Sequence, residues 1–166
     1  MVKHLITETD NLFFSKKKVS NSKNLYPMEK VSLKKVAAMM KNLDFCMMVT
    51  KDGRNTLHSR PMSNNGKVEY DGDSWFFSYR DSNKVKQIEN NPMISLIFQT
   101  DDMTFVDCYG MATITENRKM LEEKWVKGLE MWFPDGIETE GICLIKVSAH
   151  RIQFWGKNGD GEYRAE

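Results

Sequence analysis

The sequence predicts a mainly β protein, an antiparallel barrel with helices packed against its outside. Two observations lead to this fold class. Short apolar segments follow one another directly along the chain, with tight turns such as "KDGR" at 51–54 between them, which is typical of antiparallel strands. Helix-like segments at 32–43, 83–91 and 117–133 interrupt this series and would pack against the sheet. At 166 residues the chain suits a single domain.

The first predicted helix, 32–43, has Ser32 in the position of an N-cap residue. Its apolar side chains recur at helical spacing and form one stripe: Leu33, Val36, Ala37, Met40 and Leu43. The second helix, 83–91, makes about two turns and stops before Pro92, because the residue before a proline disfavours helical backbone angles. The third, 117–133, is predicted to begin at Asn117 as its cap and to stop at Gly128.

The strands are predicted from short apolar or aromatic runs bounded by turn residues. In chain order they are 45–50, 56–63, a short strand between "NNGK" and "DGD", 74–79, 93–98, 103–115 and 141–156, of which the last closes the domain. Residues 1–28 are polar and rich in lysine, without sustained periodicity, and are interpreted as an N-terminal arm before a domain at 29–166.

Composition disfavours several classes of function. The chain is 40% hydrophobic and 28% charged, with a formal net charge of +1, which gives no electrostatic reason to expect nucleic acid or an anionic membrane as partner. A membrane span needs about 18 consecutive apolar residues, and no apolar run in the sequence is that long. The expected location is therefore the cytoplasm. The cysteines (Cys46, Cys108 and Cys143) lie far apart and are predicted to be buried thiols, not a disulfide framework.

Two polar segments could face a ligand. In "HSRPMS", Pro61 has no N–H group, so it belongs at a sheet edge or a bulge, where a planar ligand could lie and Arg60 could bind an anion. The alternative is an ordinary edge-strand proline. In "SYRDSNK", the start of the second helix offers the Ser82 hydroxyl, unpaired backbone N–H groups and the Lys84 ammonium, which suit a phosphate. The alternative is a plain helix start capped by Asp81 or Ser82.

Several motifs together resemble one known family. They are "HSRPM", "WFFSYRDSNKVKQIENNPMISLIF", "YGMA", "WFPDG" and "IQFW", in this order along the chain. The chain resembles the flavin-binding split-barrel family typified by pyridoxamine 5′-phosphate oxidase, and especially its small bacterial branch called general stress protein 26. The resemblance implies a six-stranded Greek-key split barrel that forms a homodimer, with two FMN molecules at the subunit interface.

The resemblance also implies a role for individual residues. The segment Arg60, Pro61, Met62 and Ser63 would lie along the isoalloxazine ring and ribityl chain of FMN, and Phe77 and Ser78 would contact the flavin or ribityl from the next strand. Ser82, Asn83 and Lys84 would hold the FMN phosphate. Trp155, and Trp132 with Phe133, would reach the flavin from the partner subunit.

The sequence departs from the oxidase pattern at positions that carry charge. Asn83 stands where the oxidase has an arginine at the phosphate clamp, so Arg80 or Arg60 would have to compensate. Asn65 replaces the lysine that holds the substrate's phosphate, and the C-terminal arginine-histidine motif is absent from "GKNGDGEYRAE". Since bonds to a charged group contribute about 1.5–3 kcal/mol each, the chain is expected to keep the flavin site and to lack the pyridoxine-phosphate site.

The expected function is therefore an FMN-dependent oxidoreductase acting on an unidentified small substrate. Two alternatives remain: a non-catalytic flavin binder or buffer, and a haem-binding barrel, for which His150 is the candidate ligand. A nucleic-acid-binding barrel is disfavoured by the near-neutral charge and the lack of a stripe of basic and aromatic residues. No zinc spacing is present in the sequence.

Overall fold

The computed structural model describes residues 28–41, 43–63, 70–157 and 159–166. The strands are β1 (Glu29–Lys30), β2 (Phe45–Lys51), β3 (Leu57–Ser63), β4 (Asp73–Tyr79), β5 (Met93–Gln99), β6 (Phe105–Thr115), β7 (Ile142–Gly156) and β8 (Gly159–Arg164). The α-helices are α1 (Leu33–Met40), α2 (Asn83–Asn90) and α3 (Arg118–Lys124). Except for Met28, the predicted N-terminal arm lies outside the described residues, as does most of the predicted short strand before 71.

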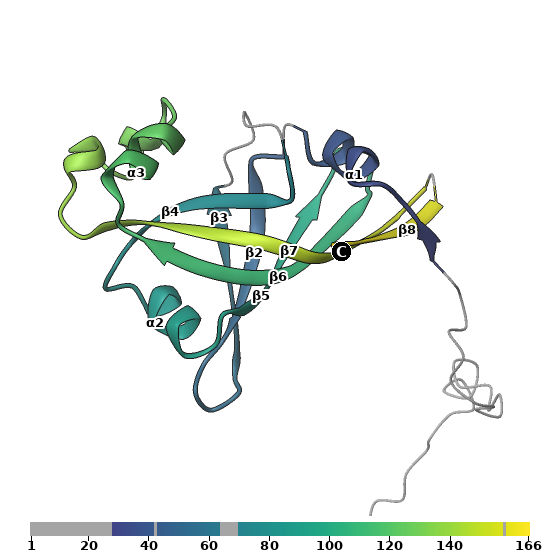
Figure 1. The fold of residues 1–166 in the computed structure, drawn as a ribbon, viewed down its shortest axis with the longest axis horizontal. Helices are drawn as coiled ribbons and strands as arrows, with labels where there is room; N and C mark the ends of the chain where they lie inside the picture. Colours follow the sequence, from purple (N-terminus) through teal and green to yellow (C-terminus); the bar gives the residue numbers. More distant parts are fainter. Residues whose placement is uncertain (1–27, 42, 64–69, 158) are drawn as a thin grey trace, which may run out of the picture.

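The strands form one mixed sheet that curls into a barrel (Figure 1). Its order is β1-β8-β7-β6-β5-β2-β3, and β4 pairs with β7. The long strand β7 explains this arrangement, because it pairs with β6 along most of its length, with β4 through residues 142–148 and with β8 through residues 151–156. Among the described residues, the pairs formed by β2 to β8 with one another are antiparallel, as predicted, and only the short pairing of β1 with β8 is parallel.

The predicted count of six strands is corrected to eight. Strands β2 to β7 account for the six of the barrel, while β8 and β1 extend one end of the sheet. The sequence of β8, "GDGEYR", has neither the alternation nor the β-branched residues of a typical strand. It is extended because it pairs with β7 from Arg151↔Arg164 to Gly156↔Gly159.

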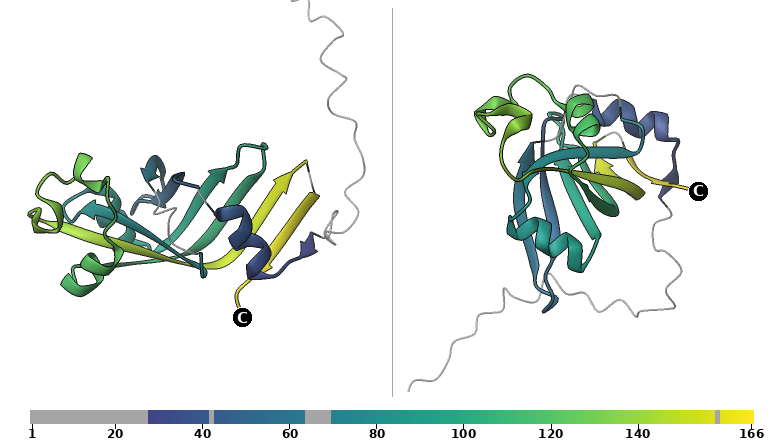
Figure 2. Two further views of the ribbon diagram at one scale, coloured as in Figure 1. Left: turned by 90° about the horizontal axis from the view of Figure 1, so that it is seen from above. Right: turned by 60° about the vertical axis from the view of Figure 1, so that its left-hand side comes forward.

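The barrel interior is the main hydrophobic core, and helices cover two of its sides (Figure 2). Helix α1 contributes Val36 and Met40, and α2 contributes Val85 and Ile88, so both predicted helical stripes face the core. Helix α3 packs through Leu121 into a smaller second cluster with residues of β4 and β7. The cysteines are buried and free, as predicted.

The third predicted helix differs from the structure. Asn117 caps it as predicted, since its side chain accepts a hydrogen bond from Met120 N, but α3 ends at Lys124, before Gly128. Gly128 instead adopts a left-handed φ of 107° and begins a single 3₁₀ turn at Leu129–Met131. The helix is interrupted because Trp125 and Phe133 both pack on the ring of Phe77 in β4, a contact that a continuous helix would not allow.

The barrel is open along one seam. Among the described residues, β3 pairs only with β2, and β4 pairs only with β7, so these two strands have free edges on either side of the opening. Pro61 lies near the end of β3, in agreement with the edge position predicted for it. The free edges leave backbone and side-chain groups of both strands available to something other than a neighbouring strand.

Candidate functional site

A cavity of about 320 Å³ lies at the seam, between the end of β3 and the end of β4. Most of the predicted site residues line it. From β3 come Pro61, Met62 and Ser63, from β4 come Phe77, Ser78 and Tyr79, and the remaining lining residues are Phe45, Lys84, Leu129, Trp132 and Phe133. The structure thus brings together the proline-containing strand and the start of α2, which the sequence had singled out separately.

One wall of the cavity is aromatic and is fixed by its own contacts. Phe77 packs edge-on against Trp125, with ring centroids 5.2 Å apart, and against Phe133 at 6.2 Å. The Tyr79 hydroxyl donates a hydrogen bond to the backbone carbonyl of Trp132 at 3.0 Å. These contacts hold the segment after α3 against β4, so the cavity offers a flat, apolar surface of the kind that binds ring systems.

The start of α2 forms a polar corner of the cavity. Lys84 Nζ donates a hydrogen bond to Ser78 Oγ at 3.1 Å, and Ser78 Oγ lies 3.2 Å from Ser82 Oγ. Ser82 occupies the N-cap position, but its hydroxyl makes no cap hydrogen bond. The N–H groups of Asn83 and Lys84 belong to the first turn and therefore have no acceptor within the helix.

A second cation lies near this corner. Arg60 extends from β3 opposite Met48, and its guanidinium donates to Met48 O at 3.1 Å, to Thr50 Oγ1 at 2.6 Å and to Gln87 Oε1 at 2.9 Å. Burial lowers the pKa of Arg60 from its ordinary value. Burial also lowers the pKa of Lys84, and the positive charge of Arg60 lowers it further.

Neither cation has a counter-ion among the residues that the structure describes. Within the described part of the chain, no carboxylate pairs with Arg60 or Lys84. Two half-buried positive charges that repel each other are unfavourable unless an anion lies between or beside them. The site therefore suits an anionic group attached to a flat ring.

The structure also decides which arginine could compensate for Asn83. Arg80 donates to Glu89 and, at 2.9 Å, to Glu116, so two carboxylates already neutralise its charge. Asn83 itself is exposed at the first position of α2. Arg60, which lacks such a partner among the described residues, is the cation that can stand in for the missing arginine.

The predicted tryptophans lie in different places. Trp132 and Phe133 line the cavity of their own chain, whereas the resemblance had assigned them to the partner's site. Trp155 does not line this cavity. It lies near the end of β7, opposite Phe105 of β6, with 41% of its surface exposed. His150, the candidate haem ligand, is an exposed residue of β7 and does not line the cavity either.

Sequence reasoning missed Thr50 and Gln87, which hold Arg60, and Phe45, Tyr79 and Leu129 of the lining. Two of these had a signal. Thr50 is a polar residue in an otherwise apolar run, "FCMMVT", and Gln87 follows Lys84 by three residues, which puts both on one face of a helix.

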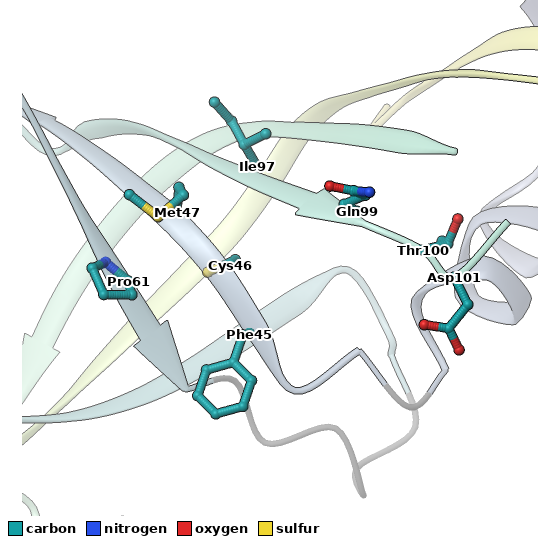
Figure 3. A pocket seen from close by; sticks show the side chains of 8 residues that line it. All are labelled: Phe45, Cys46, Met47, Pro61, Ile97, Gln99, Thr100 and Asp101. Atoms are coloured by element: carbon teal, nitrogen blue, oxygen red, sulfur yellow. The ribbon is translucent and has the colours of Figure 1, made fainter. Parts of the chain in front are cut away.

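A second hollow adjoins the seam on the outer face of the sheet (Figure 3). It measures about 550 Å³, and side chains of β2, β3, β5 and the following turn surround it: Phe45, Cys46, Met47, Pro61, Ile97, Gln99, Thr100 and Asp101. Phe45 and Pro61 line both hollows, so the seam cavity opens toward this apolar outer face.

An antiparallel barrel that opens between two edge strands, with a positively charged corner and an aromatic wall at the opening, makes this chain a split-barrel protein with a candidate ligand site in the split. A family model described as "Pyridoxamine 5'-phosphate oxidase like" matches residues 31–164. The chain belongs to this family.

Individual relatives agree with this assignment. General stress protein 26 of Bacillus subtilis is 28% identical over 79 residues, which cover 45% of this chain and 56% of the relative, so the chain matches little more than half of that protein. The solved structure of general stress protein 26 from Bacillus anthracis superimposes with a TM-score of 0.67 at 21% identity, covering 80% of this chain and 97% of that one. The solved structure of the general stress FMN/FAD binding protein from Xanthomonas citri superimposes with a TM-score of 0.64 at 21% identity, covering 74% of this chain and 87% of that one.

In the ranges that the structure describes, no group of three or more His, Cys, Asp or Glu side chains is placed to hold a metal ion. None of the helices there combines the length and the apolar character needed to cross a bilayer.

Proposed function

We propose that this protein binds FMN at the seam between β3 and β4 and serves as a flavin-dependent oxidoreductase for an unidentified small substrate. The observation that carries the proposal is the pair of cations, Arg60 and Lys84, without a carboxylate partner among the described residues, beside an aromatic-lined cavity. Residues present at the site fit FMN, which joins an anionic phosphate to a flat ring. The description of the Xanthomonas citri neighbour as an FMN/FAD binding protein supports the same reading.

The phosphate would lie at the start of α2. There the Lys84 ammonium, the Ser82 hydroxyl and the N–H groups of Asn83 and Lys84 can all donate to phosphate oxygens. At the position of Asn83 the oxidase has an arginine, which gives its clamp a second positive charge. In this chain Arg60 would supply that charge. The helix dipole of α2 adds a small favourable contribution of about 0.3–1 kcal/mol.

The ring would lie against Pro61 and Met62 on one strand and near Phe77 on the other. When bound, the flavin supplies hydride and electron transfer, and the protein binds, orients and shields it. Among the described lining residues there is no His, Asp or Glu, the side chains that most often act as general bases. This lining suits chemistry carried out by the flavin itself.

Pyridoxine phosphate is not the proposed substrate. The position that should hold its phosphate, Asn65, lacks a charge and lies outside the described residues. The end of the chain, where the oxidase has its arginine-histidine motif, forms β8 and pairs with β7. The substrate is therefore proposed to be a small molecule without that phosphate.

The absorbance spectrum of the protein as isolated, followed by titration with FMN, tests the proposal. Bound flavin or an FMN-dependent rise in melting temperature supports it. A colourless protein whose melting temperature does not respond to FMN would contradict it. Reduction of the bound flavin by NADH or NADPH faster than free FMN distinguishes the oxidoreductase from a flavin buffer. A Soret band after haem addition, lost in His150→Ala, would favour a haem-binding barrel.

The affinity for FMN is expected to fall at alkaline pH. The ammonium of Lys84 has a pKa below its ordinary value, and a bound phosphate favours the charged form, so binding at alkaline pH takes up a proton. Raising the pH through the lowered pKa removes the charge that the phosphate contacts and raises the Kd. Flavin fluorescence titrations at pH 7.5 and at alkaline pH measure this, with riboflavin, which lacks the phosphate, as control. An equal change for both flavins would show that Lys84 is not responsible.

The protein is further proposed to act as a homodimer through the outer face of the sheet. Partly exposed apolar side chains occupy neighbouring positions on β2, β5, β6 and β7. They are Phe45, Met47, Ile97, Phe105, Tyr109, Met111 and Trp155. An apolar surface of this kind commonly marks a protein interface, and it adjoins the seam cavity through Phe45.

The substitution Ile97→Asp, at the centre of this outer face, is expected to give a monomer in size-exclusion chromatography with light scattering. A carboxylate there would be buried against the partner without a counter-ion. Met131→Asp is the control, because Met131 is also apolar and 77% exposed but lies on the 3₁₀ turn after α3 and is not one of the residues of this outer face. A wild-type monomer, or a dimer that survives Ile97→Asp, would contradict the proposal.

A further inference from the structure

We infer that Gln87 and Thr50 are positioning residues that hold Arg60 toward the phosphate corner, and that they thereby set the preference of the site for a phosphorylated flavin over an unphosphorylated one. The inference rests on the proposed function, since it concerns the same site. It adds two residues that do not line the cavity and that neither the sequence pattern nor the resemblance assigned to the ligand.

The three side chains form a closed ring of hydrogen bonds. Arg60 donates through Nη1 to Thr50 Oγ1 at 2.6 Å and through Nη2 to Gln87 Oε1 at 2.9 Å. The Thr50 hydroxyl in turn donates to the same Gln87 oxygen at 2.6 Å. Each bond constrains the other two, so the guanidinium is held in one orientation instead of sampling the many rotamers of a free arginine.

The ring joins two consecutive strands to a helix further along the chain. Thr50 lies on β2 and is 1% exposed, Arg60 lies on the edge strand β3, and Gln87 lies on α2. Gln87 is one turn after Lys84 on the same helix face. Through Gln87 the position of Arg60 is therefore tied to the helix that carries the phosphate corner, and the two cations keep a fixed relation to each other.

The acceptors around Arg60 are all neutral. They are the Met48 carbonyl, the Thr50 hydroxyl and the Gln87 amide oxygen, with no carboxylate among the described neighbours. Arg60 is consequently oriented without being neutralised, and its charge stays available to an anion. A glutamate at position 87 could make similar hydrogen bonds but would pair with the guanidinium and cancel its charge.

A purely structural role, in which the ring only docks α2 on the barrel, makes a different prediction. Loss of the ring would then lower stability and affect every ligand of the cavity alike. A positioning role acts through the phosphate, so it changes the affinity for FMN and leaves the affinity for riboflavin unchanged. The ratio of these two affinities separates the two roles.

The experiment compares wild type with Gln87→Met, Gln87→Glu, Thr50→Val and Thr50→Ser, measuring the Kd for FMN and for riboflavin and the melting temperature of each. Gln87→Met keeps the size of the side chain and removes the acceptor, and we expect about a tenfold loss of FMN affinity with riboflavin unchanged. Gln87→Glu should lose at least as much FMN affinity, because the carboxylate neutralises Arg60. Thr50→Val should lose FMN affinity as well, and Thr50→Ser, which keeps the hydroxyl, should restore it.

The outcomes distinguish this inference from the proposed function. If wild type binds neither flavin, the proposed function is wrong and the inference fails with it. If wild type binds FMN but the variants keep the wild-type ratio of FMN to riboflavin affinity, only the inference is wrong. If Gln87→Met fails to fold, the ratio of FMN to riboflavin affinity is compared in the other variants. Thr50→Val against Thr50→Ser, and Gln87→Glu against wild type, then decide the question.

Discussion

The Lys84→Ala variant is expected to bind FMN about a hundredfold more weakly than wild type, a loss of about 2.7 kcal/mol. Lys84 is half-buried at the start of α2, and its ammonium has no carboxylate partner among the described residues. A charge-assisted hydrogen bond to the phosphate in this setting contributes about 1.5–3 kcal/mol. Quenching of flavin fluorescence during titration measures the change.

Lys86→Ala is the matched control for this variant. Lys86 belongs to the same helix and carries the same charge, but it lies on the exposed side of α2. Removing it should change the affinity by less than threefold. If Lys84→Ala binds FMN as tightly as wild type, the phosphate does not lie at this corner. Equal losses in both variants would indicate general attraction to a basic helix rather than a defined clamp.

The Gly110→Ala variant is expected to lose about 3 kcal/mol of unfolding free energy. Gly110 lies on β6 where the register with β7 shifts, between Tyr109 and Gly110. A Cβ at this position would lie 2.2 Å from the carbonyl oxygen of Ser148 and 3.1 Å from the Cα of Ala149. Both atoms belong to the backbone of β7, which three neighbouring strands hold in place, so the strand cannot move aside cheaply.

Gly53→Ala provides the comparison. Urea unfolding measures the free energy of unfolding of both alanine variants and of wild type. Gly53 lies in the turn between β2 and β3, and a Cβ there would meet no atom within 4 Å. The change in unfolding free energy should stay within about 0.5 kcal/mol. Equal midpoints for the two alanine variants would mean that the β6–β7 contact is not as close as described.

Local signals in the sequence were sufficient for most of the elements. Ser32 and Asn117 cap their helices as predicted, because a cap depends only on the residue and the N–H groups two or three positions later. Pro92 ends α2 through the same kind of local constraint. Strands with clear apolar or aromatic runs were found for a similar reason, since each such run is stable only when it is buried.

Two features that depend on side-chain packing were not found, the strand β8 and the early end of α3. The glycine-rich β8 becomes a strand only beside β7, where Gly161 lies against the ring of Phe154 and leaves no space for a side chain. The early end of α3 likewise follows from the packing of Trp125 and Phe133 on Phe77, which belongs to a distant strand. Both follow from packing of side chains, which the pattern of apolar residues does not specify.

By itself, the sequence determined the order of the strands β2 to β7 and of the helices, and the polar groups at the start of α2, because these follow from chemistry within a few residues. Only the tertiary structure decided which cation is available to the proposed anion site. Arg80 and Arg60 look equivalent in the sequence, but folding brings Glu89 and Glu116 to Arg80, and it gives Arg60 the neutral acceptors Thr50 and Gln87. Whether a charge is neutralised depends on the groups within a few ångströms of it, and strand pairing and helix docking choose those groups.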